Sequence, residues 1–307
     1  MLEFQLYKKR NFSSFISDSI QFFKSYGKDY FKNYIIINGA LLLVTCFLFY
    51  YTLKDIFANA MNPAFAESWI ADSNNLVIIM ILWGLLFLVS IVYSVLSLGQ
   101  PLVYVKLIEK TGKESFTSSE ILQGIWKITG RMVLYGIISM FIFFPLLIVL
   151  VVLGSLLSIL LVGIPLLIIG VPAVMVWFMQ ALIVYLYEET GYFEALGKGW
   201  KILFGNFWHI TGSSIVIYIF ASILQSAISM VPYFMMVGSI ISSGGNPESI
   251  AAFPPSMIFL YLIGIIVTYI LINVFYVHQC LVYYSSIEDT EHLHAITEID
   301  NIGNNEA

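Results

Sequence analysis

Charged residues are scarce in this 307-residue chain: Asp, Glu, Lys and Arg together make up 11% of it, whereas apolar residues make up 59%. Soluble globular proteins average about a quarter charged residues. Together with a mean hydropathy of +0.89, this shortage excludes the soluble classes and predicts a polytopic membrane protein with an all-α fold.

Cysteine and the common ligand-binding motifs are also nearly absent. The two cysteines, Cys46 and Cys280, lie in apolar runs at different predicted depths, so we expect buried thiols and no disulfide. No glycine-rich phosphate loop is evident, and no basic patch suits a nucleic acid. His292 and His294 stand in an acidic tail without further ligands, so no metal or cofactor is predicted.

Long apolar runs are what the chain does have. Each run is long enough for at least one crossing at about 20 residues per crossing, and the first lacks a cleavage site behind it, so we expect it to be retained. A polar segment over residues 1–33 precedes a membrane domain over 34–284, and an acidic tail over 285–307 is predicted to be disordered. The predicted spans are 34–53, 76–105, 132–160, 165–187, 209–232 and 256–284.

The placement of positive charge supports six spans. With six, 13 of the 14 Lys and Arg residues share one side of the membrane, and only Lys54 lies on the other. The positive-inside rule then places both termini in the cytoplasm, as expected for the inner membrane of a prokaryote. The alternative is a third crossing within Met132–Tyr187, 56 residues without a charge. It would move Lys198, Lys201 and the tail outside, so six is favoured.

An aromatic–Lys pair precedes the first, third and fifth spans: Phe23-Lys24, Trp126-Lys127 and Trp200-Lys201. Each pair stands on a short amphipathic segment that we expect to end at a Gly or Asn. We therefore predict three helical hairpins, each preceded by a cytoplasmic interfacial helix, at Ser17–Gly27, Ser118–Gly130 and Gly191–Gly205. Trp and Lys both favour the level of the lipid headgroups.

Residues 188–208 read EETGYFEALGKGWKILFGNFW. This segment resembles one from a broad prokaryotic group of polytopic proteins related to the membrane domain attached to glycerophosphodiester phosphodiesterases. In that group an acidic residue ends a span, and Ala-Leu, Ser-Trp-(Lys/Arg)-Leu and Gly-Asn-Phe-Trp-like runs come after it. Gly199 departs from the usual Ser. The resemblance implies an integral membrane protein of unassigned activity, and it brings no phosphodiesterase chemistry because no soluble catalytic domain is present.

Candidate catalytic groups are few. No Asp, Glu, Lys or Arg lies inside the six predicted spans, and His278 is the notable titratable residue there. A proton relay would need a carboxylate at its depth, so we predict an interfacial, hydrogen-bonding His. Glu188-Glu189 lacks the Arg of an intramembrane-protease motif, since position 193 is Phe. We expect these carboxylates to pair with Lys198 or Lys201, and we expect no enzyme.

Two stripes of small polar residues lie within spans. Ser90, Ser94 and Ser97 share one face of the second, and Gln225 and Ser229 belong to a stripe on the fifth. Such stripes favour close helix packing, but they can also line a cavity. The alternative function is therefore a permease or export component for a small amphipathic solute.

The favoured function is a non-enzymatic membrane protein that contacts lipid, or a membrane or cytoplasmic partner protein, at the cytoplasmic interface. The predicted contact residues are Phe23, Lys24, Trp126, Lys127, Glu188, Glu194, Trp200, Lys201 and Trp208.

Overall fold

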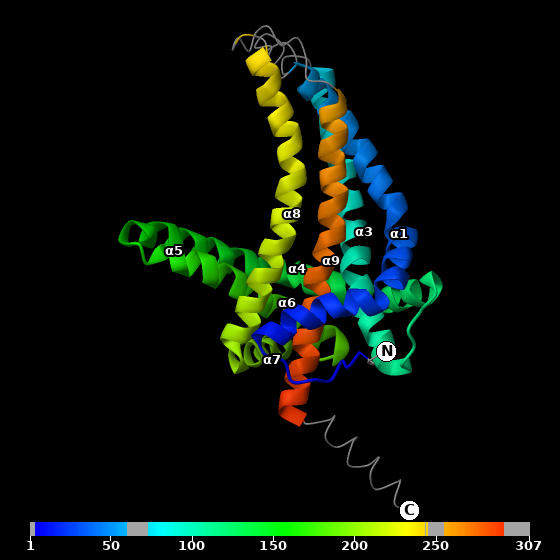
Figure 1. Ribbon diagram of the computed structural model, residues 1–307, viewed down its shortest axis with the longest axis vertical. Coiled ribbons are helices and arrows are strands. Elements are labelled where there is room, and N and C mark those ends of the chain that lie inside the picture. Colours follow the sequence, from blue (N-terminus) through cyan, green and yellow to red (C-terminus); the bar gives the residue numbers. More distant parts are fainter. Residues whose placement is uncertain (1–3, 60–72, 243, 245–254, 292–307) are drawn as a thin grey trace, which may run out of the picture. The chain divides into compact units, whose positions relative to one another are not determined.

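The computed structural model describes residues 4–59, 73–242, 244 and 255–291, and every regular element in these ranges is helical (Figure 1). Apolar helices suit a membrane because they satisfy their own backbone hydrogen bonds. The elements are α1 (Phe12–Asn59), α3 (Ser73–Thr111), α4 (Ser118–Leu157), η1 (Ser158–Leu160), α5 (Gly163–Pro165), η2 (Leu166–Gly170), α6 (Val171–Tyr187), α7 (Tyr192–Gly205), α8 (Phe207–Ser242) and α9 (Pro255–Glu291).

Six helices in the described ranges are long and apolar enough to cross a membrane. Five of the six predicted spans fall within one of them, and the sixth, 256–284, begins one residue before Met257. The chain is therefore a multi-pass membrane protein by the length and composition of its helices. The tail prediction is only partly covered: residues 285–291 continue α9 as helix, and residues 292–307, including His292 and His294, lie outside the described residues.

Two of the predicted interfacial segments do not end where the sequence pattern indicated. Helix α1 runs through Gly27 and helix α4 runs through Gly130, so both continue without interruption into the next apolar run. A glycine in a helix interior costs only about 1 kcal/mol, and the residues after each glycine continue to favour a helix. The beginning of α4 agrees with the prediction, because a capping box between Thr117 and Glu120 fixes it.

The third predicted segment is a separate helix. Helix α7 begins at Tyr192 after Gly191, and it ends at Gly205 because Asn206 leaves the helical region with φ −142° and ψ 51°. Helix α8 then begins at once with Phe207. The pair Gly205-Asn206 thus ends a helix, whereas a single glycine did not end α1 or α4.

The chain divides into two compact units. The first comprises residues 1–33, 98–219 and 273–307; the second comprises 34–97 and 220–272. In the second unit the Tyr34 hydroxyl hydrogen-bonds that of Tyr93, lies 3.3 Å from Ser97 Oγ and donates to the Tyr269 carbonyl oxygen at 2.9 Å. Many of this unit's apolar side chains, such as Phe47 and Phe87, are exposed, as lipid-facing helices require.

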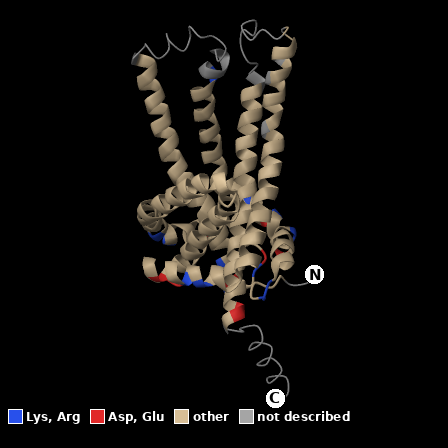
Figure 2. Ribbon diagram, turned by 90° about the vertical axis from the view of Figure 1, so that its left-hand side faces the viewer, with Lys and Arg blue, Asp and Glu red and all other residues tan. Residues whose placement is uncertain are grey.

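In the first unit α4 and α6 run antiparallel. Gly154 lies against Leu167, the rings of Phe143 and Phe178 are 4.4 Å apart, and Arg131 donates to the carbonyl oxygen of Tyr185 at 2.7 Å. In each pair the two residue numbers add to nearly the same value, which is the signature of an antiparallel register. Charged residues of this unit lie on the N-terminal segment and the start of α1, around the connection from α3 to α4, on α7 and at the end of α9 (Figure 2).

Candidate interfacial surface and buried polar network

Helix α7 packs one face against α6. Its buried residues are Tyr192, Ala195, Leu196, Gly199 and Leu203. This spacing of three and four residues is that of one helical face. The predicted amphipathic segment therefore buries Leu196 and Leu203 within the protein, and Trp200 lies at the edge of this face with 48% of its surface exposed.

Gly199 allows the close approach of the two helices. A Cβ at this position would lie 2.7 Å from the backbone nitrogen and 2.9 Å from the Cα of Ala181 on α6. Next to it, the Trp177 indole nitrogen donates to the Leu196 carbonyl oxygen at 2.8 Å, and its ring meets that of Trp200 edge-on at 5.1 Å. The glycine and the tryptophan together fix α7 on α6.

Glu188 and Glu194 form ion pairs with Lys198. The Lys198 Nζ lies 2.6 Å from Glu188 Oε2 and 3.2 Å from Glu194 Oε1. The hydrogen bond to Glu188, followed by that to Glu194, raises the pKa of the Lys198 ammonium. Glu188 Oε1 also accepts from the Tyr283 hydroxyl of α9 at 3.2 Å. The prediction that Glu188-Glu189 pairs with a nearby lysine is confirmed for Glu188, whose contacts with Lys198 and Tyr283 link the end of α6 to α7 and α9.

A stripe of aromatic side chains remains exposed on the other side of α7. We call Phe193, Trp200, Phe204 and Trp208 the α7 aromatic surface; the exposed fraction is 75% for Phe193 and 70% for Trp208. The rings of Trp200 and Phe204 are 4.1 Å apart. Lys201 is exposed beside them. Intervals of seven and four residues place Phe193, Trp200 and Phe204 along one side of α7. Trp208 follows on α8, and the ring of Phe207 lies between, stacked on Phe204 and edge-on to Trp208.

The other two predicted aromatic–Lys pairs lie on their own helices. Trp126 on α4 is 63% exposed, and Lys127 is exposed next to it. Phe23 on α1 is half-buried and stacks on Phe31, whereas Lys24 is exposed. In both pairs the lysine is exposed. The aromatic residue is exposed in the α4 pair and half-buried in the α1 pair.

The polar stripe of α3 mostly bonds to its own helix. Ser90 Oγ donates to the Leu86 carbonyl oxygen and Ser94 Oγ donates to that of Ser90, both at 2.7 Å, whereas Ser97 is buried beside Tyr34. Gln225 on α8 is half-buried, and the side chain of Ser229 lies outside the described residues. Only Ser97 is packed inside the unit, because Ser94 is exposed and Ser90 is half-buried.

His278 is the centre of a buried polar network. Its Nδ1 lies 3.2 Å from Ser19 Oγ on α1, and its Nε2 lies 3.1 Å from Ser214 Oγ on α8. Its ring also meets that of Phe15 edge-on at 5.7 Å. His278, Ser19 and Ser214 are each at least 99% buried. The predicted interfacial histidine is therefore an interior one, although its hydrogen-bonding role is as predicted.

The direction of the hydrogen bonds can be assigned. Ser19 donates its proton to the Phe15 carbonyl oxygen at 2.7 Å, so its oxygen accepts from Nδ1 of His278. On the other side, Ser214 Oγ accepts from Gln279 Nε2 at 3.0 Å, which leaves its proton for Nε2 of His278.

Gln180 on α6 extends the network. Its Nε2 donates to Gln279 Oε1 at 2.8 Å. Gln180, Gln279, Ser214, His278 and Ser19 form what we call the His278 network, and it connects α1, α6, α8 and α9. Of these residues the sequence pattern indicated His278 alone; the adjacent pairs Ser213-Ser214 and His278-Gln279 were the available signal for the others.

The side chains of the network are closed to solvent and paired with one another. Both ring nitrogens of His278 meet serine hydroxyls, no carboxylate is among its hydrogen-bond partners in the described part of the chain, and the serines are shielded from any substrate. Within the same described residues, no group of three or more His, Cys, Asp or Glu side chains could hold a metal ion. What the arrangement does provide is a set of directional links between four helices.

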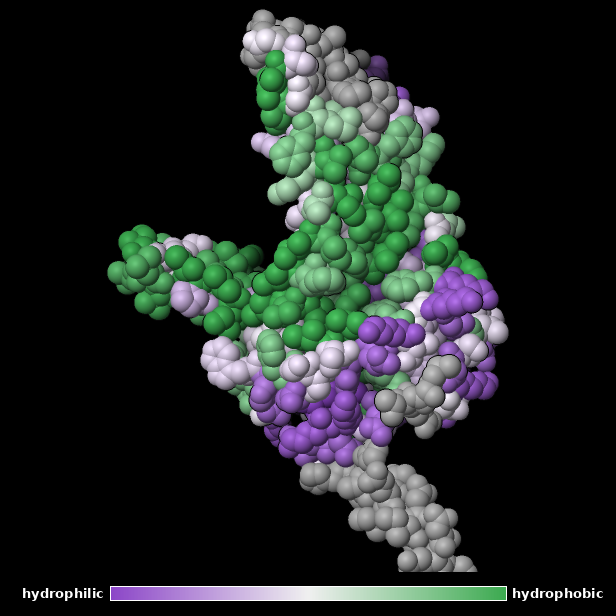
Figure 3. Space-filling view, in the orientation of Figure 1, coloured by the Kyte–Doolittle hydropathy of each residue, from purple (hydrophilic) through white to green (hydrophobic). Residues whose placement is uncertain are grey.

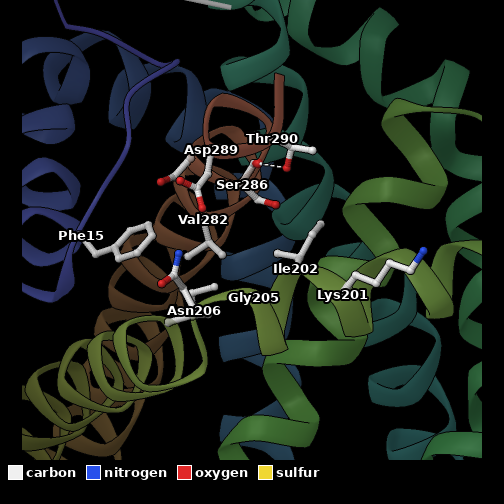
Figure 4. Close-up of a pocket in the computed structure, with 11 residues that line it drawn as sticks. Phe15, Lys201, Ile202, Gly205, Asn206, Val282, Ser286, Asp289 and Thr290 are labelled. Atoms are coloured by element: carbon white, nitrogen blue, oxygen red, sulfur yellow. Dashed lines mark hydrogen bonds between the residues drawn. The ribbon is translucent and has the colours of Figure 1, made fainter. Parts of the chain in front are cut away.

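A small cavity of about 90 Å³ lies where α7 passes into α8, next to α9 (Figure 4). Phe15 and Val282 form an apolar wall, while Asn206, Ser286 and Asp289 contribute polar atoms. Asp289 forms an ion pair with Lys9, and Ser286 accepts at its carbonyl oxygen from Thr290 Oγ1 at 2.8 Å. The cavity is large enough for a few water molecules or a very small solute, and none of the predicted polar stripes lines it.

Comparison with known proteins found no family model, no curated protein and no solved structure that matches this chain. The resemblance of residues 188–208 to the phosphodiesterase-associated membrane domains therefore stays a prediction.

Proposed function

We propose that this chain is a non-enzymatic multi-pass membrane protein that works by contact between its α7 aromatic surface and the lipid headgroup region. The observation that carries the proposal is the exposure of Phe193, Trp200, Phe204 and Trp208 on one side of α7 and the beginning of α8. Leaving four large rings in water would be costly, and exposed patches of this kind mark membrane or protein contacts.

Lipid suits this surface better than a protein partner. Tryptophan favours the level of the headgroups because its ring is apolar while its N–H remains hydrogen-bonded. Lys201 lies beside the rings, exposed, where its ammonium group can meet an anionic headgroup. Phe193 and Phe204, next in the stripe, suit the boundary between headgroups and acyl chains.

The proposed topology has three hairpins whose open ends, together with both termini, lie on the cytoplasmic side of a prokaryotic inner membrane. The basis is the distribution of Lys and Arg, nearly all of which flank the apolar runs on that side. Trp126-Lys127 and Phe23-Lys24 then reach the same interface as α7. A membrane or cytoplasmic partner protein is the alternative occupant of this surface.

The double variant Trp126→Ala/Trp200→Ala is expected to lose bound lipid. Native mass spectrometry of the protein gently extracted from its own membranes measures how many phospholipid molecules remain on the chain. We expect the double variant to retain fewer phospholipids than the unmodified chain. In a separate variant, Lys201→Ala, we expect anionic lipids to be lost before other lipids. Trp83→Ala is the matched control because Trp83 is also exposed but lies in the middle of an apolar helix.

Equal lipid retention in the double variant and the Trp83→Ala control would contradict the proposal. A stoichiometric co-purifying protein that the double variant loses would instead identify a partner protein as the occupant.

A further inference from the structure

The connection between α4 and α6 differs in composition from the connections of the other two hairpins. Residues 54–75 and 239–255, which connect the other pairs, contain charged residues, such as Asp55 and Glu248, and several asparagines. Residues 158–170, by contrast, read SILLVGIPLLIIG and contain one serine as their only polar side chain. If this turn emerged from the membrane, its apolar side chains would be in contact with water.

We propose that the turn of the α4–α6 hairpin ends inside the hydrocarbon of the bilayer, where lipid acyl chains cover it. Both helices then enter and leave from the same side without crossing, which revises the prediction for residues 132–160 and 165–187. The orientation of every other segment is unchanged, since a hairpin returns to its starting side in either case.

The turn is constructed to expose little backbone polarity. Its tight return depends on Gly163, where a Cβ would lie 1.9 Å from the Gly154 carbonyl oxygen. Ser158 donates its hydroxyl to that same oxygen at 2.7 Å, and the Leu161 backbone N–H donates to the Ser158 carbonyl oxygen at 3.0 Å. Leu161 adopts a positive φ of 60° to close the turn. Internal bonding of this kind is what backbone in hydrocarbon requires.

The side chains of the turn point away from the protein. The exposed fraction is 84% for Ile159, 73% for Leu161 and 64% for Val162. Figure 3 shows the hairpin as predominantly hydrophobic up to its end. A protein partner would be expected to meet a polar rim around an apolar centre, and this end of the hairpin has none. Acyl chains, which offer no hydrogen-bonding groups, match it better.

The length of the hairpin is compatible with this placement when it is inclined. The apolar part of α4, from Met132 to Leu157, is about 39 Å long at 1.5 Å per residue, whereas the hydrocarbon core is about 30 Å thick. Apolar helices longer than the core are accommodated by tilting. An inclined hairpin therefore keeps its turn within the core while Arg131 remains at the interface from which the hairpin starts.

The test is the accessibility of a nitroxide spin label at the turn in the full chain reconstituted into phospholipid vesicles. Ile159→Cys and Leu160→Cys are labelled separately; both side chains are exposed, so neither substitution removes packing. The identically treated native chain is subtracted to remove any signal from Cys46 and Cys280. Relaxation by oxygen, which concentrates in hydrocarbon, is compared with relaxation by a water-soluble nickel chelate.

At both sites we expect strong relaxation by oxygen and little by nickel. Strong relaxation by nickel would show that the turn emerges into water, and weak relaxation by both reagents would show that protein covers it; either result overturns the proposal. Phe144→Cys, halfway along the apolar part of α4 between Met132 and Leu157, and Ser119→Cys, at the exposed start of the helix, are the controls for lipid and water. Strong relaxation by nickel at Phe144→Cys would show that the hairpin as a whole is not inserted in the membrane. Strong relaxation by nickel only at Ile159→Cys and Leu160→Cys would show that the turn alone emerges into water.

Discussion

Replacement of Gly199 by valine is expected to separate α7 from α6 and to lower the free energy of unfolding by about 3 kcal/mol, the upper end of the usual cost of overpacking. The reason is that the new Cβ would lie within 3 Å of the Ala181 backbone on α6, which cannot move aside as a flexible side chain can. Unfolding of the purified protein in mixed micelles with increasing dodecyl sulfate measures the change.

Gly197→Val is the matched control, because it makes the same substitution two residues away on the same helix. A Cβ at Gly197 has no neighbour within 4 Å, so we expect a change of less than about 0.5 kcal/mol, as for other surface positions. Equal stability of the two variants would show that α7 does not pack on α6 through Gly199. The close approach also gives a physical reason for glycine here, where the resembling proteins commonly have serine.

His278→Leu is expected to lower the free energy of unfolding by about 2 kcal/mol, within the range for leaving a buried donor unsatisfied. Leucine fills most of the ring's space but cannot accept the proton of Ser214 or donate to Ser19. His209→Leu is the control, because His209 is exposed on α8 and is not a member of the network. The same mixed-micelle titration measures both.

A second substitution separates the hydrogen bonds from simple loss of packing. In His278→Leu/Ser214→Ala the hydroxyl that lost its acceptor is removed, although the Gln279 amide then loses its own acceptor, so we expect the two substitutions together to cost less than the sum of their separate costs. If His278→Leu matches His209→Leu, or if the double variant is less stable than the single one by the full cost of Ser214→Ala, the network does not connect the helices as described.

The helices could be predicted from sequence because absence of charge is a long-range signal. The uncharged 56 residues of Met132–Tyr187 already required at least two apolar helices, and the structure has α4 and α6 there. The end of α7 was also predictable, since Gly205-Asn206 breaks the pattern. The uninterrupted course of α1 and α4 was not predicted, because a lone glycine only weakens a helix, and the spacing of residues around it does not reveal whether the helix continues.

The contacts between helices in the first unit could not be predicted from the sequence pattern, for a different reason. An apolar face on α7 is compatible with a membrane surface or with another helix, and only the approach of Gly199 to Ala181 distinguishes them. The His278 network likewise needs residues from four helices that are as much as 259 positions apart in the chain. Spacing along one helix carries no information about such a meeting.

The most direct test of the α7 aromatic surface is photo-crosslinking in native membranes. Trp208 is replaced by the photoreactive residue p-benzoylphenylalanine, and Phe193 is replaced in a second variant; both positions are exposed on that surface. After irradiation, mass spectrometry of the purified chain identifies the attached molecule. Lipid contact predicts an adduct with the mass of a phospholipid at both positions. A discrete protein adduct without a lipid adduct would contradict it.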